Sequence, residues 1–134
     1  MNRPGRRRAA DRDRGAAAVE LALVLPILLL IVFGIVDFGR MLNAQIALTE
    51  AAREGARAEA LGADPDSRVE AAAGYLDGGV AATVETGCPG TDAVVRVDHT
   101  FTFITPIGPF LELYGGGMDG SVPMQGRGVM PCFE

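Results

Sequence analysis

The sequence has no lysine, one histidine and two cysteines, and these scarcities narrow the chemistry that it can perform. His99 has no Ser or Cys nucleophile constellation around it, so we interpret it as a structural or partly exposed residue and not as a catalytic base. Two cysteines and one distant histidine are too few for a zinc site. We therefore expect no enzyme activity, no cofactor and no small-molecule substrate.

Basic residues are also scarce after the first part of the chain. Residues 1–14 contain six arginines and two aspartates, a balance of +4, whereas residues 37–134 contain six arginines and fourteen acidic residues, a balance of −8. The acidic part has no basic cluster to neutralise phosphates, which argues against nucleic-acid binding. By the positive-inside rule, the asymmetry predicts a cytoplasmic N-terminus and an extracytoplasmic C-terminal part.

One long apolar run follows the arginines. The 21 residues from Ala16 to Val36 carry a single charge, Glu20, and as a helix they would rise about 31 Å, enough to cross a bilayer core. The run is longer than the apolar region of a signal peptide, and Leu42 makes a poor signal-peptidase site before Ala44. A retained anchor is favoured. A secreted binding module cut near Ala44 and a generic membrane-anchored interaction protein stay open as alternatives.

The pattern divides the 134 residues into three parts. Residues 1–15 form a basic cytoplasmic leader that we expect to be unstructured, residues 16–36 a transmembrane helix, and residues 37–134 an extracytoplasmic domain. The helix should continue to about Leu61, where Gly62 is a natural stop. Its outer part offers only a weak apolar stripe of mostly small residues, made of Leu42, Ile46, Thr49, Ala52 and Arg53.

The outer domain is predicted to be α+β, with a short second helix and a small antiparallel sheet. Asp64 and Pro65 are typical of a helix start, and this helix should run to Leu76. Thr105–Tyr114 is too interrupted by proline for a central strand. Period-two patterns predict three strands, at Val80–Glu85, Ala93–Phe103 and Ser121–Met130, the last pairing with the second.

Three sets of side chains in this domain could be structural. An oxidising compartment favours a disulfide between Cys88 and Cys132 over two free thiols. Asp37 and Arg40 mark the outer membrane boundary as interfacial anchors or an ion pair. The aromatic residues near the second predicted strand could form core or dock on the bilayer or a partner, and they are Phe101, Phe103, Phe110 and Tyr114.

Glu20 is the strongest candidate for function. A carboxylate inside the apolar run costs free energy on insertion, so its retention there indicates a role. The alternative is a tolerated glutamate that snorkels to the nearby cytoplasmic interface, where the cost is smaller. Gly15, followed by Ala16 and a hydrophobic helix with an acid at its fifth position, resembles the class III signal of type IV pilins and pseudopilins. That resemblance implies cleavage after Gly15 by a prepilin peptidase, and pairing of Glu20 with the amine of a neighbouring subunit.

A closer resemblance is carried by RGAAAVELALVLPILLLIVFGIVDFGR and the following NAQIALTEAAREGARAEAL. These segments look like the TadE-like family of tight-adherence (Flp) pilus biogenesis, and the tail segments VVRVDHTFTFITPIGP and SVPMQGRGVM fit its strand–proline–strand pattern. One departure is Ala16, where many pilins have Phe or Met. The resemblance implies a pseudopilin-like membrane protein of Tad/Flp pilus assembly or a related secretion apparatus, with other subunits of that apparatus as partners.

Overall fold

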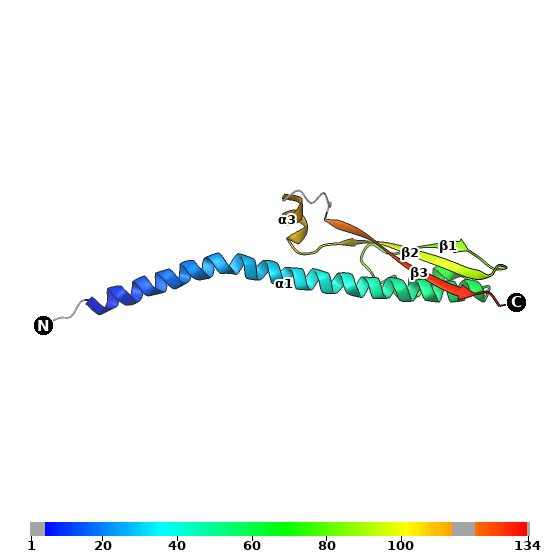
Figure 1. The fold of residues 1–134 in the computed structure, drawn as a ribbon, viewed down its shortest axis with the longest axis horizontal. Helices are drawn as coiled ribbons and strands as arrows, with labels where there is room; N and C mark the ends of the chain where they lie inside the picture. The colour runs from blue at the N-terminus through cyan, green and yellow to red at the C-terminus, as the bar shows by residue number, and fades with distance from the viewer. Residues whose placement is uncertain (1–4, 114–119, 134) are drawn as a thin grey trace. The chain divides into compact units, whose positions relative to one another are not determined.

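The computed structural model describes residues 5–113 and 120–133. Within them the chain forms α1 (Gly5–Ala60), α2 (Pro65–Ala73), β1 (Ala81–Thr86), β2 (Asp92–Thr102), α3 (Ile107–Leu113) and β3 (Ser121–Pro131) (Figure 1). The chain separates into two compact units, residues 1–36 and residues 37–134, and α1 contributes to both. The predicted α+β class, with a long apolar helix, a short second helix and an antiparallel sheet, is confirmed.

The expectation of an unstructured leader is wrong, because α1 already begins at Gly5. The leader is rich in arginine and alanine, which both favour helix strongly, so its charge does not prevent it from extending the apolar helix. At the other end α1 stops at Ala60, and Gly62 adopts a positive φ of 69°. The Ala63 N–H donates to the Ala58 carbonyl, which closes the helix end as the glycine predicts.

The second helix begins as predicted but ends three residues early. The Asp64 side chain accepts hydrogen bonds from the backbone N–H groups of Asp66 and Ser67, and Pro65 occupies the first turn. The helix ends at Ala73 rather than Leu76, because Gly74 caps it by donating to the Glu70 carbonyl.

The three strands form one antiparallel sheet in the order β1–β2–β3, as the sequence predicts. β2 and β3 pair along their full lengths, from Asp92 opposite Pro131 to Thr102 opposite Ser121. The alternation predicted for β2 also holds, because its apolar face is buried and Thr100 and Thr102 on the other face are exposed. Between β2 and β3 the proline-interrupted segment forms α3, while Tyr114 lies outside the described residues.

The core lies between the sheet and the part of α1 after Asp37, where Figure 1 shows the strands running alongside the helix. The predicted helix stripe is largely wrong, because Ile46 is 65 % exposed whereas Leu48 is fully buried. Small side chains instead let the sheet approach closely, and the buried helix residues that contact it are Ala47, Leu48, Ala51, Ala52 and Ala56. On the sheet side, Val95 and Val97 complete this core.

Two glycines of β3 set how closely the helix and the sheet approach. A Cβ atom on Gly126 would lie within 3.0 Å of the Leu48 carbonyl, and one on Gly128 would lie as close to the Ala52 carbonyl. Real Cβ atoms essentially never come so near to backbone. β3 therefore contacts the helix backbone directly, which only glycine at these two positions allows.

Candidate functional site

The apolar part of α1 exposes its side chains almost continuously. It is the one helix among the described residues that is long and apolar enough to cross a membrane, and none of its most apolar stretch is buried. Pro26 lies inside it without ending it, which is tolerated where neighbouring groups or local adjustments satisfy the carbonyl that the proline leaves unbonded. An apolar helix with no protein cover needs lipid or other helices around it.

Glu20 is the single charge of this apolar segment, and its side chain is exposed within it. Among the side chains that the structure describes, none forms a hydrogen bond or an ion pair with Glu20. In lipid, such a carboxylate is costly unless it pairs with another polar or charged group. Gly15 and Ala16 are exposed as well, and the space beside Gly15 is open, since a Cβ atom added there would meet no other atom within 4 Å.

Asp37, the first residue of the second unit, binds the turn at residues 104–105. Its buried carboxylate accepts hydrogen bonds from the backbone N–H groups of Ile104 and Thr105, each at 3.4 Å, and from the Thr105 hydroxyl. Arg40, one helical turn later, lies 3.5 Å from the same carboxylate. The predicted Asp37–Arg40 ion pair is present, but Asp37 is 1 % exposed, which the sequence did not indicate.

Arg40 connects this turn to the sheet. Its guanidinium lies 3.3 Å from the Asp77 carboxylate, donates to the Thr102 carbonyl at 3.4 Å and stacks 5.2 Å above the Phe101 ring. Phe101 is buried and meets Phe103 edge to face at 5.6 Å. Phe101 therefore belongs to the core, half-buried Phe103 packs against it, and Tyr114 lies outside the described residues.

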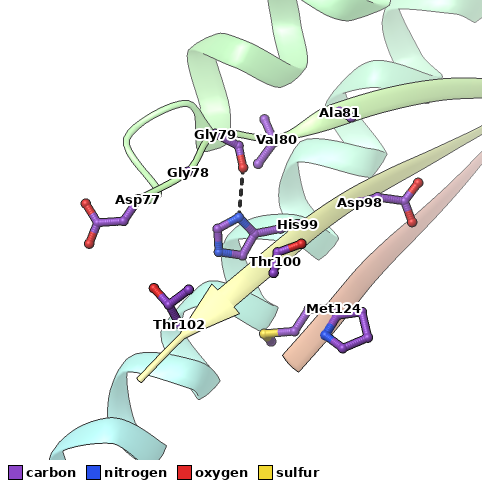
Figure 2. Close-up of a pocket in the computed structure, with 11 residues that line it drawn as sticks. Asp77, Gly78, Gly79, Val80, Ala81, Asp98, His99, Thr100, Thr102 and Met124 are labelled. Carbon is purple, nitrogen blue, oxygen red and sulfur yellow. Dashed lines mark hydrogen bonds between the residues drawn. The ribbon is translucent and has the colours of Figure 1, made fainter. Parts of the chain in front are cut away.

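His99 lies beside a shallow groove of about 590 Å³ between β2 and the turn after α2. Figure 2 shows its ring turned towards the Gly79 carbonyl, with Nδ1 2.8 Å from that oxygen. His99 is 7 % exposed, and its contact with the Gly79 carbonyl fastens the 78–79 turn to the sheet. This contact gives the histidine a structural role.

A disulfide joins Cys88 and Cys132, as predicted, with Cα atoms 5.9 Å apart. It ties the loop between β1 and β2 to the residue after β3, and the Cys132 N–H also donates to the Thr91 carbonyl. On the outer face of the sheet, Glu85 bridges Arg96 and Arg127 at 3.3 and 3.0 Å. Among the described residues no three His, Cys, Asp or Glu side chains are placed to hold a metal ion.

These observations define the class: a small α+β domain, closed by a disulfide, on an apolar helix of membrane-spanning length. Residues 15–57 match the family described as TadE-like protein, so this part of the chain, which lies within α1, is similar to that family. The match begins at Gly15 and includes Glu20, Asp37 and Arg40. It covers most of the two helical segments that carry the closer resemblance in the sequence. Neither the comparison with curated proteins nor the comparison with solved structures gives a match.

Proposed function

We propose that this protein is a single-pass, pseudopilin-like structural subunit in the assembly of Tad/Flp pili or a related secretion apparatus. The observation that carries the proposal is the TadE-like match over residues 15–57, which contains both the apolar helix and its lone carboxylate. The protein acts through contacts with other subunits rather than by catalysis. Its partners are the membrane and the other subunits of the apparatus.

In the proposed topology the arginine-rich leader is cytoplasmic and residues 37–134 are outside. The charge asymmetry supports this direction, and the Cys88–Cys132 disulfide is consistent with an oxidising compartment. Cleavage near Ala44 to release a secreted module fits poorly, because Ala44 is buried and α1 runs unbroken through it. Such a cut would also remove Asp37, which holds the 104–105 turn.

Glu20 is proposed to be an assembly contact between subunits. Placing a charge in lipid costs less free energy when it pairs with an opposite charge than when it stands alone. The proposed partner of Glu20 is the amine at the N-terminus of a neighbouring subunit. Replacing Glu20 by Gln should therefore weaken co-purification with the other pilus subunits and reduce piliation. Exposed Glu54→Gln, on the same helix as Glu20, is the matched control and should leave both unchanged. Normal piliation and co-purification of the Glu20→Gln protein would refute this role.

Cleavage after Gly15 is the second part of the proposal, because it creates the free amine at Ala16. In cells that contain a prepilin peptidase, mass spectrometry of the membrane-extracted protein should show a chain beginning at Ala16. A Gly15→Leu chain should keep its leader. An intact leader on the unsubstituted protein in such cells would rule out the cleavage, and it would leave the membrane anchoring untouched.

A further inference from the structure

The segment from Ile104 to Leu113, here called the juxtamembrane segment, exposes apolar side chains beyond those of the membrane helix. Ile104 is 65 % exposed and Leu113, at the end of α3, is 80 % exposed. The ten residues carry one charge, Glu112, in a domain that is otherwise rich in acidic residues. Isolated apolar side chains are ordinary on protein surfaces, but an apolar, nearly uncharged segment marks a contact surface.

Asp37 connects the start of this segment to the end of the apolar run. The carboxylate of Asp37 binds the N–H groups of Ile104 and Thr105, where the segment begins. Asp37 directly follows Val36, the last residue of the apolar run. Chain connectivity alone therefore ties the start of the segment to the end of the membrane span, whatever the orientation of the two units.

The segment is too short to cross a membrane. The seven residues of α3 extend about 10 Å, against a bilayer core of about 30 Å, so in contact with lipid they would lie at the interface. A protein partner would find few polar side chains to recognise here. A lipid surface needs only apolar area, because the hydrophobic effect has no directional requirement.

We propose that the juxtamembrane segment docks on the outer surface of the bilayer, with Ile104 and Leu113 entering the boundary between headgroups and acyl chains. This gives the protein a second membrane contact beside the transmembrane helix. The inference rests on the proposed membrane anchoring. The Asp37 hydrogen bonds hold the two contacts together, which explains why a buried carboxylate stands directly after the span.

Single-tryptophan variants can test this contact, because the natural chain has no tryptophan. We would prepare Ile104→Trp, Leu113→Trp and the control Phe133→Trp. Phe133 is 68 % exposed and follows the end of β3 that pairs with Asp92, away from the juxtamembrane segment. Each full-length protein is placed in phosphatidylcholine vesicles with or without bromine on the acyl chains. The juxtamembrane variants should lose most of their fluorescence to the brominated lipid, and Phe133→Trp should keep its fluorescence.

A fourth variant, Leu28→Trp in the span, separates the two proposals. If Leu28→Trp is quenched but Ile104→Trp and Leu113→Trp are quenched no more than Phe133→Trp, the juxtamembrane inference is wrong and the anchoring stands. If Leu28→Trp also escapes quenching, the anchoring itself fails. Blue-shifted, unquenched emission at Leu113→Trp would indicate a protein contact, such as a second copy of the chain, and would overturn the inference as well. Resistance of each oxidised variant to proteolysis confirms that its domain is folded.

Discussion

Asp37 shows how one buried side chain can organise a small domain. Replacing it by Ala leaves two backbone N–H groups and the Thr105 hydroxyl without their acceptor, and it leaves Arg40 without one of its two acidic partners. Losing a buried charged acceptor of this kind should lower the free energy of unfolding by about 3 kcal/mol. Denaturant unfolding of the detergent-solubilised protein measures this change.

The control for Asp37→Ala is Glu50→Ala on the same helix. Glu50 pairs with Arg53 at 3.3 Å, but both side chains are more than 60 % exposed, so its loss should cost under about 0.5 kcal/mol. Equal stabilities for the two variants would show that the buried Asp37 contacts add nothing. Asp37→Asn, which keeps one acceptor oxygen, should lie between them.

The sequence indicated Asp37 as a boundary residue and a partner of Arg40 but not its contacts with the 104–105 turn, and the reason is physical. Its partners lie 67 and 68 residues away along the chain, and no local pattern encodes such a pairing. Local patterns did predict the Asp64 cap, the positive-φ stop at Gly62 and the alternation along β2, because each depends on neighbouring residues. The Cys88–Cys132 pairing was predictable over 44 residues only because the chain has no other cysteine.

At the scale of elements, the packing of β3 on α1 depends on the absence of side chains. Gly126→Ala and Gly128→Ala should each force the strand away from the Leu48 and Ala52 backbone, at a cost of about 2–3 kcal/mol for overpacking a filled interface. The midpoint of denaturant unfolding should fall accordingly.

Gly39→Ala is the matched control for these two variants. Gly39 lies in α1, the helix that β3 packs against, and no atom lies within 4 Å of an added Cβ there. Alanine should therefore stabilise the helix by up to about 1 kcal/mol. If Gly126→Ala were as stable as Gly39→Ala, the close approach of strand and helix would be wrong. The sequence could not reveal this approach, since glycine in a strand also marks bulges and bends, and the predicted apolar stripe pointed to Ile46 instead of Leu48.

At the scale of the whole molecule, the disulfide compensates for a core made largely of alanine and valine. Such side chains bury little apolar area each, so the unit of residues 37–134 should depend strongly on its one covalent link. The bond closes a 44-residue separation and should contribute about 4 kcal/mol by restricting the unfolded chain.

Cys132→Ser should therefore unfold at a clearly lower denaturant concentration than the oxidised protein, and reduction of the unsubstituted protein should reproduce the same loss. Because the disulfide forms only where the compartment is oxidising, cells that lack disulfide-forming capacity should accumulate less of the natural chain, and the level of Cys132→Ser should not change further. Equal unfolding midpoints for the oxidised protein and Cys132→Ser would mean that the apolar core alone holds the domain. The close glycine-mediated contact of β3 with α1 would then be the main source of its stability, and the Gly126 and Gly128 substitutions would become the more damaging changes.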